Sequence, residues 1–195
     1  MRRQLTVALM ISLVSATACG DRDNEATMDS MAGRLDSAGT AATDETVMRD
    51  GDIFASMTAS NSSEVALGKL GVDSATNAEV KEFARMMITD HESMNKEVHN
   101  VALALDLVSQ SGDRTEDVVD DSKDRMDNLK GKHGADFDRE FMDIMVESHE
   151  STLKMLDKAA SSTGTAQLVT AINAARPKVE QHLSRAKSIR DNLNR

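Results

Sequence analysis

The chain has 195 residues and carries 33 acidic against 23 basic side chains, for a formal net charge of −10. Its four aromatic residues are all Phe, which argues against an all-β fold, because sheets draw on aromatic and β-branched side chains. The negative charge argues against a nucleic-acid partner, because phosphate binding needs clustered Lys and Arg. With one Pro and ten Gly the chain has few turn-forming residues, and this favours long helices.

The first residues have the order of a bacterial export signal. Arg2 and Arg3 precede an apolar run over residues 5–14, and the small residues of 16–18 stand directly before Cys19. This order resembles a lipoprotein signal, in which the cysteine becomes the first mature residue and carries the lipid. We therefore expect a signal peptide over 1–18, lipid attachment at Cys19 and a periplasmic protein held on a membrane, by preference the outer one. Ordinary secretion with Cys19 as a free thiol is the alternative.

The stretch that follows the cysteine has a different composition. Residues 20–50 mix acidic residues with Ala, Ser, Thr and Gly and show no apolar period. Such a stretch buries too little apolar surface to offset the entropy lost on ordering. We expect a flexible acidic linker over 19–50 and a folded domain over 51–195.

The remaining residues follow a helical period. A first helix is predicted to end near Asp73, and Thr76 with Glu79 has the spacing of a capping box that opens a second helix. The pattern breaks over 109–117, resumes in a short helix over 118–129, and continues in a third long helix from about Asp136. A last long helix reaches 193 and should kink at Pro177. The predicted fold is an all-α four-helix bundle with an extra short helix between the second and third long helices.

Four polar residues interrupt the apolar faces of the long helices. They stand near mid-height, one on each long helix: Glu64, His91, His149 and His182. One inward ligand per helix is how bundles build metal sites. We therefore predict a transition-metal site (Fe, Zn, Mn or Cu) from these residues, with Asp90 and Glu150 as outer acceptors that orient the rings. His99 and His133 fall off the apolar faces and are expected at the surface.

Two other interpretations of this pattern stay open. Buried Glu and His side chains could hydrogen-bond one another in a metal-free network that specifies helix pairing. The paired Glu-x-x-His motifs of di-iron bundles are absent. Met87, Met94 and Met145 stand one turn from histidines and would suit copper(I), but methionine is also a common filler of cores, and we favour that role.

Several segments together resemble one family of exported bacterial proteins. They are the Val80–His91 segment, the segment around Glu64, Phe137-Asp138 followed by Met145–Glu150, and Pro177 five residues before His182. These blocks, in this order over about residues 50–193, resemble the domain-of-unknown-function 4142 family. The resemblance implies a ferritin-like helical bundle and export, and the activity of that family is not established.

The sequence thus favours an exported, lipid-anchored envelope protein whose interior cluster binds a transition-metal ion. Its predicted partner is the membrane, through the lipid on Cys19. The alternative is a metal-free helical module with a structural or interaction role in the envelope. The chain has no nucleotide-binding loop and no serine-nucleophile motif, so an enzyme is the less favoured interpretation.

Overall fold

A computed structural model describes residues 44–107 and 110–195. Helices account for nearly all of this part of the chain. In order they are α1 (Asp44–Ser74), α2 (Ala78–Ala104), α3 (Asp113–Leu129), α4 (Gly134–Ser162) and α5 (Ala166–Leu193). None of these helices is both long enough and apolar enough to cross a membrane.

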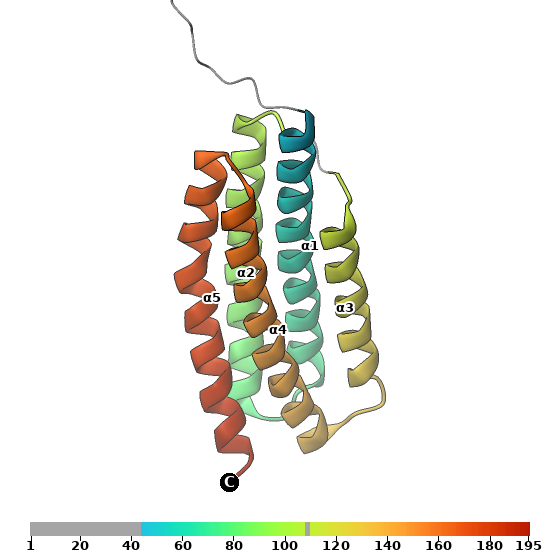
Figure 1. Cartoon of the computed structure of the whole chain (residues 1–195). Coiled ribbons are helices and arrows are strands. Elements are labelled where there is room, and N and C mark those ends of the chain that lie inside the picture. The colour runs from blue at the N-terminus through green and yellow to red at the C-terminus, as the bar shows by residue number, and fades with distance from the viewer. Residues whose placement is uncertain (1–43, 108–109) are drawn as a thin grey trace, which may run out of the picture. The chain divides into compact units, whose positions relative to one another are not determined.

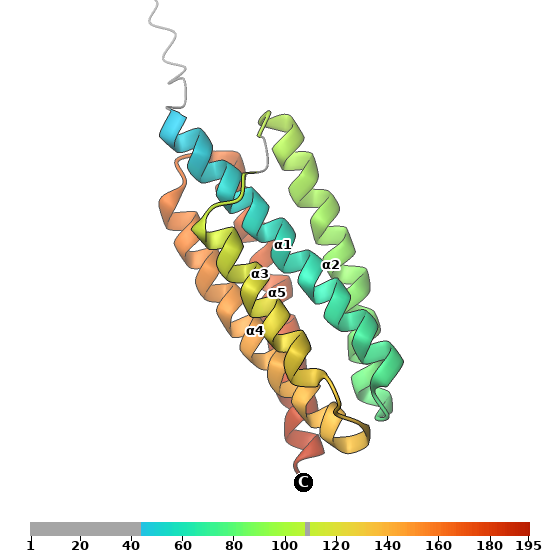
Figure 2. The same cartoon turned by 90° about the vertical axis from the view of Figure 1, so that its right-hand side faces the viewer.

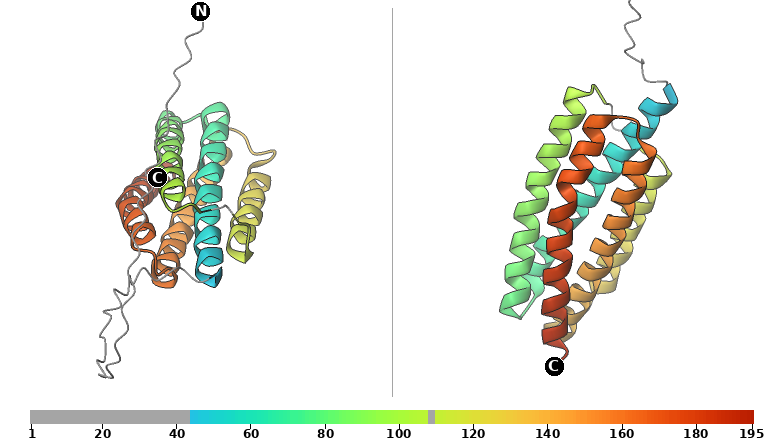
Figure 3. Two further views of the ribbon diagram at one scale, coloured as in Figure 1. Left: turned by 90° about the horizontal axis from the view of Figure 1, so that it is seen from above. Right: turned by 60° about the vertical axis from the view of Figure 1, so that its left-hand side comes forward.

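The four long helices form an antiparallel bundle of two hairpins. Helix α1 pairs with α2, α4 pairs with α5, and the hairpins pack side by side so that α2 meets α5 and α1 meets α4 (Figures 1 and 3). The short helix α3 lies outside the bundle against α1 and α4 (Figure 2). The predicted all-α bundle with an extra short helix between the second and third long helices is confirmed.

The turn between α1 and α2 differs in detail from the prediction. Asn77, rather than Thr76, caps α2, and its side chain accepts hydrogen bonds from the amides of Glu79 (2.8 Å) and Val80 (3.3 Å). Thr76 instead donates to the buried carboxylate of Asp138 on α4, which also accepts from the amides of Thr76 and Asn77, each at 2.9 Å. The capping-box spacing therefore predicted the start of the helix correctly, but Thr76, the predicted cap, makes a tertiary contact with Asp138 instead.

Helix α3 begins earlier than the sequence pattern predicted. The predicted break over 109–117 includes the first turn of α3, which starts at Asp113. The reason lies on α1, where Asp52 accepts hydrogen bonds from the amide (3.3 Å) and hydroxyl (2.8 Å) of Thr115 and pairs with Arg114 at 3.0 Å. A carboxylate of another helix therefore satisfies polar groups in the first turn of α3. The local sequence around residue 113 gives no signal of this contact.

Helix α1 also begins before the domain start predicted at residue 51. It starts at Asp44, and Asp50 within it is buried and accepts hydrogen bonds from the hydroxyls of Thr163 (2.7 Å) and Thr165. The segment 44–50 thus belongs to the helical domain. The predicted signal peptide, Cys19 and the rest of the predicted linker lie outside the described residues.

The core is divided along the bundle axis into two apolar clusters. One, nearer the α1–α2 turn, is built on side chains such as Leu67, Met87, Phe141, Met145 and Ala186. The other, toward the opposite end, is built on residues that include Ile53, Val98, Leu156, Ile172 and Val179. On each long helix the polar residue predicted for the metal site falls between the residues of the two clusters. A buried polar layer therefore separates the two halves of the core.

Candidate metal centre

The polar layer brings together three of the four predicted ligands. His91 on α2, His149 on α4 and His182 on α5 are 2%, 1% and 0% exposed. Their ring centroids lie 5.3 to 5.9 Å apart, and each ring places a ligand nitrogen within 4.8 Å of the ligand nitrogens of the other two. We refer to these three residues as the histidine triad.

Each ring of the triad uses one nitrogen to reach an acceptor outside the cluster. His91 donates through Nδ1 to Oδ1 of Asn61 at 2.9 Å, and His149 donates through Nδ1 to the Met145 carbonyl at 2.7 Å. His182 donates through Nε2 to the Asp90 carboxylate at 2.8 Å. Because all three partners are acceptors, these nitrogens carry the protons. The remaining nitrogen of each neutral ring is left with a lone pair.

Those remaining nitrogens are buried and have no hydrogen-bond partner among the described residues. They are Nε2 of His91, Nε2 of His149 and Nδ1 of His182. Buried polar atoms are nearly always paired, since an unpaired one costs free energy. Three such lone pairs in one polar layer form a donor set that fits a metal cation.

The electrostatics of the layer keep at least two rings neutral. Burial, together with the charge that protonated His149 or His182 would carry, lowers the pKa of His91 to about 2. Burial also lowers the pKa of His182, although its hydrogen bond to Asp90 opposes that shift. Neutral imidazole is the form that binds metals.

Glu64 lies in the same layer but is not one of the group whose ligand atoms approach within 4.8 Å. It is 2% exposed and accepts a hydrogen bond from the Ser148 hydroxyl through Oε1. Its other oxygen, Oε2, is buried without a hydrogen-bond partner in the described part of the chain, and the negative charge of Glu64 favours a proton on His182. The structure thus places Glu64 beside the triad as a nearby anion.

Of the two residues predicted to orient histidine rings, Asp90 contacts a ring of the triad and Glu150 does not. Asp90 does orient a ring, but the ring is His182 of the facing helix and not its neighbour His91. Burial raises the pKa of the Asp90 carboxyl, yet the hydrogen bonds from His182 and Lys178 outweigh burial and hold that pKa below its usual value. Glu150 does not reach His149, because it points to the surface, where its carboxylate pairs with Lys187 at 2.7 Å.

Sequence reasoning missed Asn61 and Ser148, the side chains that hold His91 and Glu64. Both are buried polar residues on the inner faces of their helices. The available signal in the sequence was helical spacing, because Asn61 stands three residues before Glu64 and Ser148 three residues after Met145. His99 and His133 are exposed, as expected. Met87 and Met145 are fully buried members of one apolar cluster, as filler would be.

Comparison with known sequences settles the family. The sequence profile described as "Domain of unknown function (DUF4142)" matches residues 35–189, which is most of the chain. The chain belongs to the DUF4142 family. This match confirms the resemblance seen in the sequence blocks, and it reaches upstream of the start of α1.

Among solved structures, the DUF4142 chain is similar to a protein described as "CopM in the Cu(II)-bound form". The superposition has a TM-score of 0.57 at 17% sequence identity and covers 73% of this chain and 96% of the other. At that identity the likeness shows the fold alone. No curated protein matches the sequence.

Proposed function

We propose that this protein binds one transition-metal ion in the interior of its helical bundle, and that the ion is copper. The ligands would be Nε2 of His91, Nε2 of His149 and Nδ1 of His182. The observation that carries the proposal is the set of three buried lone pairs that no described residue satisfies, each on a ring whose other nitrogen is already hydrogen-bonded.

The surroundings fit a bound cation in two ways. Metal-binding histidines characteristically donate their second N–H to a carboxylate or a carbonyl, which fixes ring orientation and tautomer, and all three rings do so here. Two carboxylates, Glu64 and Asp90, are placed to offset the positive charge of a divalent ion. A layer that served only to pack the helices together would need neither the oriented imidazole rings nor the nearby carboxylates.

The choice of copper rests on the donor set and on one relative. Imidazole ligands suit zinc, copper, iron and nickel, and among divalent ions of this row copper binds most tightly. The similar fold of CopM, in its Cu(II)-bound form, supports the same ion. The chain has a single cysteine, Cys19, so a thiolate-rich site of the kind that favours zinc or iron–sulfur clusters is excluded.

The site of action that we propose is the cell envelope. The order of residues 2–19 supports export and lipid attachment at Cys19, and from there the domain would hold its ion close to a membrane. The role proposed is binding and retention of the ion, with no chemical reaction assigned.

Elemental analysis and thermal unfolding of the untagged mature protein test the proposal. We expect about one equivalent of copper after incubation with Cu(II) and removal of excess ion. Copper at roughly a hundredfold excess over Kd should stabilise the fold by about 2.7 kcal/mol, and a chelator should reverse this. His149→Ala should abolish the stabilisation, whereas His99→Ala, which removes an exposed histidine, should leave it unchanged.

The metal-free alternative predicts a different result. If the triad were only a hydrogen-bond network, no ion would raise the melting temperature, and a chelator would have no effect. His149→Ala would then cost on the order of 1–3 kcal/mol through its unsatisfied partners, with or without copper. That outcome would overturn the metal proposal and leave a structural module. Stronger stabilisation by zinc than by copper would retain the site but overturn the assignment of the ion.

A further inference from the structure

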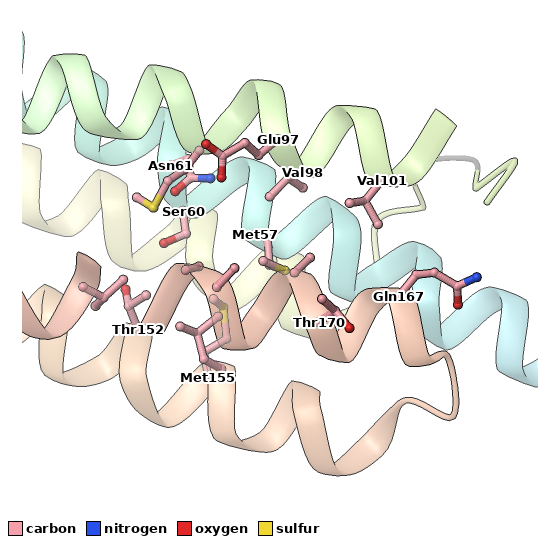
Figure 4. A pocket seen from close by; sticks show the side chains of 16 residues that line it. Met57, Ser60, Asn61, Glu97, Val98, Val101, Thr152, Met155, Gln167 and Thr170 are labelled. Atoms are coloured by element: carbon pink, nitrogen blue, oxygen red, sulfur yellow. The ribbon is translucent and has the colours of Figure 1, made fainter. Parts of the chain in front are cut away.

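A cavity of about 400 Å³ lies between the helices (Figure 4). Its lining residues Met94, Thr152 and Val179 stand one turn from the three histidines of the triad, on the side away from the α1–α2 turn. All four long helices line it, mostly with apolar side chains. The lining residues that matter below are Met57, Asn61, Glu97, Val98, Leu156 and Ala171. No histidine of the triad lines the cavity, so it is distinct from the metal centre.

The cavity exists because one wall is made of small side chains. Helix α5 contributes Ala171, Ala174 and Ala175 to the lining, and α2 contributes Val98 and Val101, all of them short side chains that occupy little of the space between the helices. A volume of this size falls in the usual range of small-molecule pockets, which commonly lie between the helices of bundles. For scale, an apolar cavity of about 150 Å³ holds benzene, so roughly a dozen heavy atoms fit here.

One mostly buried polar side chain, Asn61, lines the end of the cavity and has a donor available there. Asn61 is 8% exposed, and its Oδ1 is occupied by the His91 ring. Its amide nitrogen Nδ2 makes no hydrogen bond to another described residue and is not fully enclosed, and Figure 4 shows the Asn61 amide among the residues that line the cavity. A ligand atom there would therefore have to be a hydrogen-bond acceptor.

The charge of the lining selects against anions. Glu97 is the one charged residue in the lining, and its exposed side chain lies at the edge of the cavity. No Lys or Arg of the described chain joins it there. An anionic headgroup such as a fatty-acid carboxylate would meet like charge and find no cation, whereas a neutral acceptor would meet no such penalty.

We propose that this cavity binds a neutral, mostly apolar small molecule that carries a carbonyl group. The carbonyl oxygen accepts the free N–H of Asn61, and the hydrocarbon body packs against Met57, Val98 and Leu156. Because Asn61 also holds His91, the bound molecule and the triad share one side chain. The proposal needs no metal, so its success or failure is separate from that of the copper site.

The test uses two probes of equal size, 2-nonanone and octanoate, on the chelator-treated mature protein. Isothermal titration calorimetry should detect saturable binding of 2-nonanone at one site per chain. Octanoate should bind at least tenfold more weakly. Asn61→Leu should weaken 2-nonanone about two- to tenfold, as expected for the loss of one neutral hydrogen bond. His133→Ala, which removes an exposed histidine outside the cavity, should leave the affinity for 2-nonanone unchanged.

A matched pair of variants on α5 locates the binding. Ala171→Phe fills the cavity and should abolish binding of 2-nonanone, whereas Ala166→Phe adds the same ring at an exposed position outside the cavity and should not. Circular dichroism will check that each variant is folded, and Ala171→Leu is the milder filling variant if Ala171→Phe does not fold.

Absence of saturable binding of 2-nonanone, or equal binding by the two Phe variants, would overturn the proposal. So would octanoate binding as tightly as the ketone. Binding of 2-nonanone that weakens as protein concentration rises, with dimers in sedimentation, would assign the cavity to a second copy of the chain instead.

Discussion

The nitrogens of the triad divide into two sets, one hydrogen-bonded to acceptors and one buried without a partner among the described residues. This division makes Asp90 a positioning residue for His182, because its carboxylate fixes which nitrogen of that ring bears the proton. Asp90→Asn should therefore lower copper affinity about tenfold or more, in line with losses of metal-orienting partners elsewhere. Glu150→Gln is the matched control, since Glu150 pairs with Lys187 at the surface and should not affect the affinity. Competition titrations against a chelator of known affinity would measure both, and equal affinities for the two variants would contradict the role of Asp90.

Burial of neutral His91 has a consequence for the metal-free protein. Its pKa is about 2 in the folded state, against an ordinary value of 6.5 when unfolded. The unfolded chain therefore binds the proton first, and stability is lost as pH falls below about 6.5. For this residue alone the loss between pH 7 and pH 5 is roughly 2 kcal/mol. Denaturant titrations of the chelated protein at both pH values would measure the loss, and His91→Gln should reduce it. Equal stability at pH 5 and pH 7 would show that His91 is not buried in the neutral form.

At the scale of helices, close packing at Gly71 sets how α1 meets its neighbours. A Cβ atom there would lie 2.6 Å from Cζ of Phe141 and 2.9 Å from Cβ of Ala84, both fully buried residues. Gly71→Ala should therefore destabilise the fold by about 1–2 kcal/mol, because overpacking outweighs the gain in helix propensity. At Gly164 an added Cβ would meet nothing within 4 Å, so Gly164→Ala should be neutral or slightly stabilising. Chemical denaturation would compare the two, and a neutral Gly71→Ala would mean that α1 can shift away from Phe141.

The elements also show how far the sequence could predict this molecule. The period of apolar residues predicted all four long helices and the inward positions of His91, His149 and His182, because period and burial are properties of one helix at a time. The contacts between helices were not predictable in the same way. Asp90 serves the ring across the interface rather than its neighbour, and Ser148 occupies one oxygen of Glu64. Such pairings depend on the relative rotation and height of two helices, and a single sequence does not specify either.

For the molecule as a whole, the start of the folded domain can be tested by two truncations. A chain beginning at residue 44 keeps all of α1 and should melt within a few degrees of the mature protein, because the residues removed were predicted to be linker. A chain beginning at residue 51 loses Asp50 and the buried hydrogen bonds that it accepts from Thr163 and Thr165. It also loses Arg49, whose guanidinium donates to the Ser162 carbonyl at 3.1 Å. The second truncation should therefore be less stable by several kcal/mol, and equal melting temperatures would contradict a structural role for these bonds.

The order of residues 2–19 predicts that the same domain is held on a membrane through its N-terminus. If Cys19 carries the lipid, the mature chain should fractionate with membranes, and mass spectrometry should find its first residue acylated. Stable anchoring needs more than one acyl chain, because a single chain binds membranes only marginally. Cys19→Ser should then give a soluble exported protein or an unprocessed precursor. Either form should bind copper with unchanged affinity once purified, because Cys19 is not among the proposed ligands. A mature chain that begins with an unmodified Cys19 would rule out the anchor and leave ordinary secretion.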